Sequence, residues 1–268
     1  MTHSELDTRD KNFELHSLAQ YVGQWLSLDF TIMSETYPAP KGGASLVLSF
    51  RMQKKVVLIL GSGSLAAFRA FACLEADSFV IILAKGGPSS ACDELRWRAQ
   101  QNQVSFVDWD TLPAAEDDSV TLNQFLSKAP RISLAMVTDT VAIGNRRSYL
   151  SAQKLYEVFK SHHIPVNMPD MPDLCDFSFT STHRFEHHET GEKTPLQIGV
   201  TTNGYGCRLA SRLRREIVTK LPREIGAAVE KVGKMRNMAL TNGDDQVEKA
   251  DSTLEEGNCK VYSLNNSC

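Results

Sequence analysis

Short apolar runs alternate with amphipathic stretches through the middle of the chain, at the lengths typical of strands and helices. The runs Val56–Leu60 and Phe79–Ala84 are continuously apolar, which is typical of strands buried on both faces of a parallel sheet. Between them, Leu65, Phe68 and Ala72 recur at helical spacing. The pattern predicts strands at 45–50, 55–60, 79–84, 104–108, 132–137 and 164–167, and helices at 64–76, 90–101, 120–128 and 146–162.

Strands that alternate with helices at this spacing predict an α/β fold, with a Rossmann-type parallel sheet and right-handed crossovers. After Pro165 the pattern changes to two strands, at 174–179 and 196–202, which flank a charged turn, and then to helices at 207–220 and 223–239. This second part is expected to be a smaller α+β region.

The chain is expected to have four segments. Residues 1–42 form a polar N-terminal extension that ends in a Pro/Gly-rich linker and carries a short helix around 13–25. The Rossmann-type domain spans 43–173, and the smaller region spans 174–240. The last segment, 241–268, has six acidic residues against two lysines and little apolar content, which predicts a disordered tail.

Composition narrows the class of protein. Of the 268 residues 42% are hydrophobic, and 29 basic against 32 acidic side chains leave a net charge of −3. This balance argues against a nucleic-acid binder, and no apolar run approaches the roughly 20 residues of a membrane helix. The charged first dozen positions argue against a secretory or mitochondrial leader. Six cysteines without a Cys-x-x-Cys pair are typical of free thiols in the cytoplasm.

The first candidate for chemistry follows the strand at 55–60. The segment Gly61-Ser-Gly-Ser-Leu-Ala66 matches Gly-x-Gly-x-x-Ala between a strand and a helix, the context of a dinucleotide-binding loop. Gly61 permits the tight turn, Gly63 lets the backbone approach a pyrophosphate, and Ala66 allows the helix to pack closely on the strand. The helix N-terminus would then face the phosphates. The alternative is a glycine-rich turn without a ligand.

The end of the next strand departs from the usual pattern of NAD-binding domains. An Asp or Glu about 20 residues after the glycines normally binds the ribose hydroxyls of NAD. This strand instead ends in Leu83-Ala-Lys-Gly-Gly87. Either Lys85 meets the additional phosphate of NADP or it is simply solvated, so both nicotinamide cofactors stay open.

A loop rich in aspartate follows the strand at 164–167, with the sequence Met168-Pro-Asp-Met-Pro-Asp-Leu-Cys-Asp-Phe177. Pro-Asp pairs are ordinary turn chemistry, because Asp side chains hydrogen-bond the local backbone. The loop also lies where a late strand ends, which is the edge at which doubly wound sheets bind ligands. These residues are compatible with a plain turn and with a functional loop.

Taken from Asn167, this loop closely resembles the Asn-Val-x-Asp-x-Pro-x-Leu-Cys-Asp-Phe signature of the fungal sirohaem synthases, which are bifunctional precorrin-2 dehydrogenases and sirohydrochlorin ferrochelatases. Further segments agree in order and spacing: Gly61–Ala66, Leu196-Gln-Ile-Gly-Val-Thr-Thr-Asn-Gly204 with Arg208, and Ala228-Val-Glu-Lys-Val-Gly-Lys-Met-Arg236. The resemblance covers about residues 43–240.

The resemblance implies an NAD-binding domain at 43–173 and a dimerisation and substrate region at 174–240. It implies that the tetrapyrrole precorrin-2 is oxidised to sirohydrochlorin with NAD, and that ferrous iron is then inserted as a second substrate. The family's essential aspartate falls on Asp170, a general base for both steps, whereas Asp173 and Asp176 shape the loop. The family's cofactor contacts fall on Gly61, Ser62, Gly63, Ser64, Leu65, Lys85, Gly86 and Thr138.

The chain also departs from the family. Met168 and Pro169 replace a Val and a small residue, Gly206-Cys207 replaces a common Ser-Pro, and the family's C-terminal helical segment has no counterpart after about Gly243. Dehydrogenase activity is therefore expected, and ferrochelatase activity stays open. Two alternatives remain: a non-catalytic NAD(P)-binding regulatory protein that lacks this segment, and an unrelated NADP-dependent reductase.

Basic residues on the helix at 207–220 form another candidate site. Arg208, Arg212 and Arg215 lie at i, i+4 and i+7, so they share one helical face. Arg binds carboxylates in a bidentate manner, and precorrin-2 carries many of them. Asn203, Arg208 and Arg212 are therefore the candidate substrate-binding residues, with a solvated surface face as the alternative. The histidines at 183–189 lie in a polar connection without cysteines at zinc spacing, so we expect no metal site.

The two helices after residue 202 carry more apolar positions than a small region can bury by itself. These positions are Leu209, Leu213, Ile217, Ala227 and Val229. We therefore expect a symmetric homodimer, the commonest closed assembly.

Overall fold

The structure, a computed structural model, describes residues 42–113, 115–141 and 146–251, with side chains through Leu240. The chain divides into two units, Met1–Leu46 and Val47–Cys268, and the helices and strands described below lie in the second. The expected extension and its helix around 13–25 lie outside the described residues.

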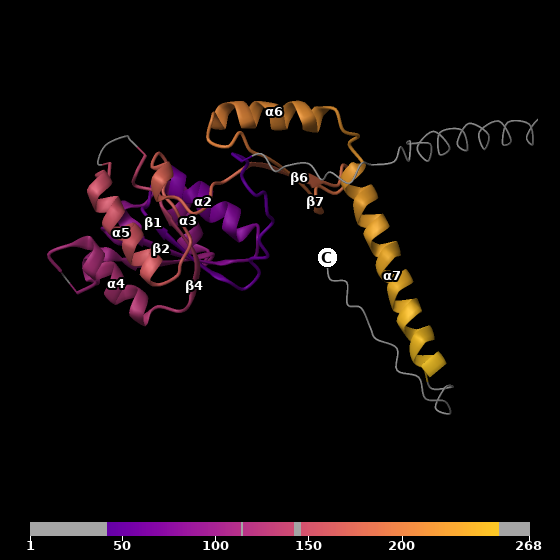
Figure 1. Ribbon diagram of the computed structural model, residues 1–268, viewed down its shortest axis with the longest axis horizontal. Coiled ribbons are helices and arrows are strands. Elements are labelled where there is room, and N and C mark those ends of the chain that lie inside the picture. Colours follow the sequence, from indigo (N-terminus) through magenta and orange to yellow (C-terminus); the bar gives the residue numbers. More distant parts are fainter. Residues whose placement is uncertain (1–41, 114, 142–145, 252–268) are drawn as a thin grey trace, which may run out of the picture. The chain divides into compact units, whose positions relative to one another are not determined.

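A five-stranded parallel sheet forms the first part of that unit (Figure 1). Its strands pair in the order β3-β2-β1-β4-β5, which confirms the Rossmann-type α/β prediction. The strands are β1 (Val56–Leu60), β2 (Phe79–Ala84), β3 (Val104–Asp108), β4 (Ile132–Val137) and β5 (Val166–Asn167). The helices between them are α2 (Ser64–Leu74), α3 (Asp93–Gln100), α4 (Asp118–Lys128) and α5 (Tyr149–Ser161), with short 3-10 turns at Gly87–Ser90 and Trp109–Thr111.

Alternate residues of the central strand β1 face opposite layers of the domain. Leu58 and Leu60 pack in the apolar cluster of α4 and α5, whereas Val57 and Ile59 pack in that of α2 and α3. These four side chains are at most 1% exposed, which explains why the strand is apolar at every position. Ala66 of α2 is fully buried, as expected for a helix that lies close to its strand.

The strand order brings the ends of β1 and β4 next to each other. From β1 the chain runs outward to β2 and β3, and it returns to β4 on the other side of β1. The order of the strands thus reverses between β1 and β4, which is called a topological switch point. Doubly wound proteins bind their ligands there, in a crevice between the loops at the carboxyl edge of the sheet, where the parallel strands end. The loops after β1, β4 and β5 are therefore the region in which to look for a site.

The second part is an antiparallel hairpin, β6 (Ser181–Glu186) and β7 (Lys193–Val200), followed by α6 (Cys207–Thr219) and α7 (Ile225–Asp251). Both helices pack on the hairpin, α6 on both strands and α7 mainly on β7. Gly226 permits the α7 contact, because a Cβ there would lie 2.5 Å from Thr194 Oγ1. Within the described part of the chain, no helix combines the length and the apolar character needed to cross a membrane.

The strand predicted at 45–50 is wrong. This segment forms no strand, and Leu46, Leu48 and Phe50 are 82%, 63% and 55% exposed. A strand pattern becomes a strand only where a neighbouring edge pairs with it, because the preference is largely a preference for packing against neighbours. Neither edge of the sheet, β3 or β5, pairs with this segment.

The strand predicted at 174–179 is also wrong. The region begins with a 3-10 turn, Pro172–Leu174, after which Phe177 and Phe179 pack, partly buried, on the cluster of α2 and α3. The first strand of the hairpin is instead β6, which contains the first part of the histidine-rich stretch 183–189, whereas His187 and His188 follow the strand. The sequence did not predict β6 because the strand is mostly polar and only its Phe185 is buried.

Helix α7 continues further than the sequence indicates. It runs to Asp251, through the first part of the stretch 241–268 that was expected to be a disordered tail. The acidic and weakly apolar composition suggested disorder, but the residues as far as Asp251 include several good helix formers, and no proline interrupts them. Residues 252–268 lie outside the described part.

Candidate functional site

The loop after β1 has the geometry of a dinucleotide-binding turn. Gly61 has φ +107°, a conformation that favours glycine, and its amide donates to Leu83 O at 3.0 Å. A Cβ at this position would lie 2.5 Å from Thr138 Oγ1, which follows β4. Both the turn and the close approach of the neighbouring strand end therefore require Gly61.

Gly63 is the N-cap of α2, and its surroundings are open. Its backbone is extended, with φ −83° and ψ −175°, and no atom lies within 4 Å of the place that a Cβ would take. No acidic side chain stands in the first turn of α2, where Ser64 and Leu65 lie. The first amides of a helix have no partner inside it, so this face suits an anion such as a pyrophosphate. Ser62 is held by its carbonyl, which accepts from Cys92 N at 2.9 Å.

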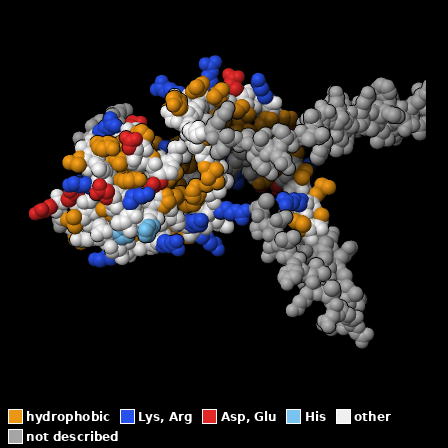
Figure 2. Space-filling model, in the orientation of Figure 1, with side chains coloured by type: hydrophobic (Ala, Val, Ile, Leu, Met, Phe, Trp, Pro, Cys, Tyr) orange, Lys and Arg blue, Asp and Glu red, His pale blue; other side chains and the backbone are white. Residues whose placement is uncertain are grey.

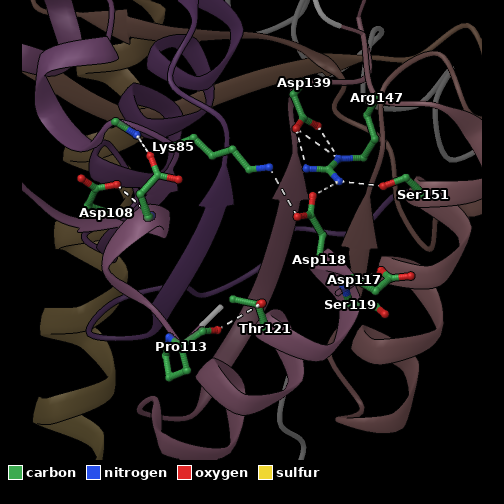
Figure 3. Close-up of polar contacts among 12 residues, drawn as sticks. Lys85, Asp108, Pro113, Asp117, Asp118, Ser119, Thr121, Asp139, Arg147 and Ser151 are labelled. Carbon is green, nitrogen blue, oxygen red and sulfur yellow. Dashed lines mark hydrogen bonds and ion pairs between the residues drawn. The ribbon is translucent and has the colours of Figure 1, made fainter. Parts of the chain in front are cut away.

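Lys85 and Gly86 follow β2, where NAD-binding domains usually carry an acid. The Lys85 ammonium lies 3.4 Å from Asp118 Oδ1, and 63% of the lysine side chain is exposed, so the ion pair is weak (Figure 3). Gly86 has φ +74°, and its amide donates to Asp110 Oδ2 at 2.8 Å. A cation and a carboxylate are thus both present at this strand end, and the geometry does not select between NAD and NADP.

Thr138 ties the end of β4 to the end of β1. Its amide and its hydroxyl each donate to Leu60 O at 2.8 Å, and the residue is 7% exposed. Because its hydroxyl also lies against the Gly61 turn, the structure brings together the expected cofactor residues that follow β1 and β4.

A partly buried charge cluster includes Asp139, the residue after Thr138, and the sequence did not suggest it (Figure 3). Arg147 Nε and Nη2 donate to Asp139 Oδ1 and Oδ2 at 3.0 and 2.8 Å. Arg147 Nη1 donates to Asp118 Oδ2 at 2.9 Å and to Ser151 Oγ at 2.8 Å. Burial alone would lower the pKa of the Arg147 guanidinium, but the hydrogen bonds and charges of the two aspartates outweigh burial and raise that pKa.

A positional signal could have revealed this cluster. Asp139 comes two residues after the end of β4, and Asp118 begins α4, so both were bound to lie at the carboxyl edge once the strands were assigned. Their shared partner, Arg147, shows no such signal, because it precedes α5 without a motif of its own.

The aspartate-rich loop after β5 is closed by short-range hydrogen bonds. The Cys175 thiol lies 3.1 Å from both the amide and the carbonyl of Met168, accepting from the first and donating to the second. Asp176 Oδ2 accepts from Val166 N at 3.0 Å, so Asp176 holds the base of the loop. Burial raises the pKa of the Cys175 thiol, which favours the protonated form that can donate.

Asp170 takes no part in these contacts. It adopts φ +62°, in the left-handed region that Asp tolerates better than most residues, and it is exposed. Its carboxylate has no hydrogen-bond or ion-pair partner among the described residues. The Thr140 hydroxyl donates to Pro169 O at 2.6 Å, which joins this loop to the segment after β4. The free carboxylate therefore belongs to the same edge as Gly61 and Thr138.

The expected substrate residues lie on and before α6. Asn203 has φ +52°, and its amide donates to Thr201 Oγ1 at 3.1 Å. Arg208 is exposed, and Arg212 is 75% exposed with its Nε 3.9 Å from Glu216 Oε1. Among the described residues, no hydrogen bond or ion pair joins these two arginines to the carboxyl edge of the sheet.

An apolar groove lies on α6 beside Arg212. Leu209, Leu213 and Ile217 are 52%, 43% and 43% exposed. With Arg212, Glu216 and Lys220 they line a groove of about 400 Å³, called the α6 groove below. Figure 2 shows hydrophobic side chains gathered over this helix with basic side chains around them.

Two histidines of the hairpin, His183 and His187, have structural partners. His187 Nε2 lies 2.8 Å from Glu230 Oε2 of α7, and the rings of His183 and Phe185 meet edge to face with centroids 4.7 Å apart. Over the ranges that the structure describes, no three His, Cys, Asp or Glu side chains are grouped as metal ligands would be.

Two family models match the chain. One, described as putative NAD(P)-binding, matches residues 48–181, which is half of the chain and contains the whole parallel sheet. The other, described as the central part of the sirohaem biosynthesis protein, matches residues 194–220, which cover most of β7 and all of α6.

Similar proteins come from fungi and bacteria. The siroheme biosynthesis protein met8 of Schizosaccharomyces pombe is 35% identical, over 76% of this chain and 66% of that protein. A probable uroporphyrinogen-III C-methyltransferase of the same organism is 28% identical, over 73% of this chain and 37% of that protein. A siroheme synthase of Pseudoalteromonas translucida is 23% identical, over 70% of this chain and 33% of that protein. The chain thus spans between a third and two thirds of the length of these relatives.

A solved structure named SirC, precorrin-2 dehydrogenase, aligns with 72% of this chain and 79% of its own at 14% identity and a TM-score of 0.46, values too low to bear on activity. The NAD(P)-binding family model covers the glycine loop and all the strands of the parallel sheet. The chain belongs to the family of sirohaem biosynthesis proteins that contain an NAD(P)-binding domain.

Proposed function

We propose that the chain oxidises precorrin-2 to sirohydrochlorin with NAD, a step of sirohaem synthesis. The observation that carries the proposal is the arrangement at the carboxyl edge, where the glycine loop follows β1, Thr138 follows β4 and Asp170 follows β5. The glycine turn and a free carboxylate thus lie at the same edge of the sheet, after two strands, β1 and β5, that both pair with β4. The names of the fungal and bacterial relatives suggest sirohaem synthesis, and the resemblance of the aspartate loop to the family signature suggests precorrin-2 as the substrate.

The glycine loop fits a dinucleotide. The open space at Gly63 accommodates a pyrophosphate, and the acid-free first turn of α2 offers it backbone amides. In the proposed complex, the residues that hold the cofactor are Gly61, Ser62, Gly63, Ser64, Leu65, Lys85, Gly86 and Thr138. The bound nicotinamide would supply the acceptor for a hydride.

Asp170 is the proposed general base. Oxidation of precorrin-2 removes one hydrogen as a hydride and another as a proton, and a carboxylate without a competing partner can accept the proton. Iron insertion also needs a base, because pyrrole nitrogens lose their protons when the metal enters the ring. Ferrous iron is therefore a candidate second substrate of the same residue.

The C-terminal region completes the proposal. Asn203, Arg208 and Arg212 are assigned to the carboxylates of the tetrapyrrole, which exposed guanidinium groups bind well. The apolar side chains of the α6 groove, Leu209, Leu213 and Ile217, are assigned to the interface of a homodimer, since they are exposed in the single chain. Arg212, which lines the same groove, is assigned to the substrate and not to the interface. We place the Rossmann domain at 43–173, the dimerisation and substrate region at 174–240, and the protein in the cytoplasm.

An anaerobic assay with purified protein and precorrin-2 tests this function. With NAD, reduced cofactor and sirohydrochlorin should appear in equal amounts, and the same reaction with NADP should be slower. Ferrous iron is then added, and sirohaem formed faster than in a protein-free control would establish the chelatase. Cofactor binding without turnover would favour a non-catalytic regulatory protein. Turnover that requires NADP and a different substrate would favour an unrelated reductase.

A further inference from the structure

Thr140 links two loops that the sequence places far apart. It lies three residues after the end of β4 and is fully buried. Its hydroxyl is 2.6 Å from Pro169 O and 3.3 Å from Val137 O, so it reaches across to the aspartate-rich loop and back to its own strand. A donor hydroxyl has one proton, and the shorter distance identifies Pro169 O as its acceptor.

The hydrogen bond from the Thr140 hydroxyl to Pro169 O fixes the backbone at Asp170. Pro169 O belongs to the peptide group that joins Pro169 to Asp170, so this hydrogen bond sets the orientation of that peptide plane. Asp170 then continues with φ +62°. A residue other than glycine persists in this region only where its surroundings hold it, and residues in such conformations concentrate at functional sites. The peptide plane and the φ angle together set the direction in which the carboxylate leaves the backbone.

The segment that carries Thr140 also carries Thr138. Thr138 is bonded to Leu60 O, and Thr140 to Pro169 O, with one residue between them. A short rigid segment therefore relates the turn proposed to bind the cofactor to the loop that holds the proposed base. A shift of about 1 Å between such groups can cost about 100-fold in rate.

We propose that Thr140 is a positioning residue of this site. Its buried hydroxyl holds the Pro169–Asp170 peptide so that the Asp170 carboxylate keeps a constant place relative to the glycine loop. This inference rests on the proposed function, because it assigns a role in the dehydrogenation that Asp170 is proposed to assist. Thr140 itself touches neither substrate nor cofactor.

The test compares Thr140→Val, which removes the hydroxyl and keeps the shape, with Thr140→Ser, which keeps the hydroxyl. For Thr140→Val we expect kcat for precorrin-2 oxidation to fall about 10- to 100-fold, with the dissociation constant for NAD unchanged. Thr140→Ser should restore most of kcat. Amide hydrogen exchange in the peptide that contains Asp170 should become faster in Thr140→Val and not in Thr140→Ser.

Thr194→Val is the matched control, because Thr194 is also fully buried and donates to a carbonyl, Phe185 O at 3.0 Å, within the hairpin. It should lower the unfolding temperature about as much as Thr140→Val does, without the loss of kcat. Equal losses of kcat in the two variants, or a normal kcat in Thr140→Val, would overturn the inference. If the wild type does not oxidise precorrin-2, the proposed function fails. Thr140 is then judged by exchange alone, and unchanged exchange in Thr140→Val rejects its role in holding the loop.

Discussion

Arg147 holds Asp139 twice: its guanidinium binds both carboxylate oxygens, and its amide donates to the Asp139 carbonyl at 2.9 Å. Asp139 lies between Thr138, which contacts the glycine loop, and Thr140, which contacts the aspartate loop. The two contacts with Arg147 therefore anchor the segment that joins the two loops. The ion pair is therefore expected to stabilise the site without forming part of it.

Replacing Arg147 should destabilise the fold. Arg147→Met leaves Asp139 and Asp118 close together without their cation, and the side chain that is lost is only 11% exposed. Breaking a buried pair typically costs about 3–5 kcal/mol, and because these carboxylates are partly exposed we expect about 2–3 kcal/mol. Urea denaturation measures this loss. Arg96→Met, which removes an exposed pair with Asp93, should change stability by less than about 0.5 kcal/mol.

Gly63→Val should abolish cofactor binding while the protein remains folded. Valine fits the backbone at φ −83°, and no protein atom lies within 4 Å of its Cβ, so the side chain occupies only the space proposed for the pyrophosphate. Calorimetry with NAD and thermal unfolding measure the two effects. An unchanged affinity in the folded variant would remove this loop from the cofactor site. Gly61→Ala, in contrast, should lower the unfolding temperature, because its Cβ would meet Thr138.

Asp170→Asn should reduce dehydrogenation by about 10²–10⁴-fold, the usual cost of losing a general base. Asparagine tolerates the left-handed conformation at this position, so the loop should keep its shape. Binding of NAD should be unchanged, which calorimetry checks beside the rate assay. Asp173→Asn is the control, because Asp173 is exposed in the same loop and should change turnover little. Similar rates for the two variants would mean that Asp170 is an ordinary turn residue.

Leu213→Glu should dissociate the proposed homodimer. Leu213 lies in the α6 groove, and a carboxylate there would lose its hydration if a second chain covered the groove. Light scattering at micromolar concentration should give twice the chain mass for the wild type and the chain mass for the variant. Leu150→Glu, an exposed leucine near the start of α5, should remain dimeric. A monomeric wild type would contradict the assignment of the α6 groove.

Stability in acid should depend on Asp117. The hydrogen bond from Lys154, with the backbone and side-chain hydrogen bonds of Ser119, lowers the pKa of Asp117 from 3.8 to about 2. The folded-state pKa of Asp117 lies below its unfolded value, so the ionised carboxylate stabilises the folded state. This stabilisation is complete above the unfolded pKa and is lost as the pH falls from about 4 to about 2. Asp117→Asn should be less stable than the wild type at neutral pH, and the difference in urea midpoint should vanish near pH 2. A constant difference would contradict the linkage.

The sequence by itself determined the parallel sheet and the place of the glycine loop. Strands β2, β3 and β4 begin and end at the predicted residues. β2 is a continuous apolar run between Ser78 and Lys85, whereas β3 and β4 are mainly apolar runs that each include a serine. The turn at Gly61–Gly63 was equally recognisable, since Gly61 has a positive φ angle, a conformation that favours glycine. The aspartate loop was recognisable from its residues, and its place at the edge followed from the strand before it.

Only the tertiary structure decided which side chains meet. Thr140 and Pro169 are 29 positions apart, as are Arg147 and Asp118, and no pattern in either segment announces the partner. The pattern at 45–50 predicted a strand that does not form, and the polar strand β6 was not predicted. A segment forms a strand only where another strand pairs with it: β6 pairs with β7, whereas none of the described strands pairs with 45–50. The spacing of apolar residues indicates which face of a single segment is buried. The contacts of Thr140 with Pro169 and of Arg147 with Asp118 depend instead on how separate segments pack together.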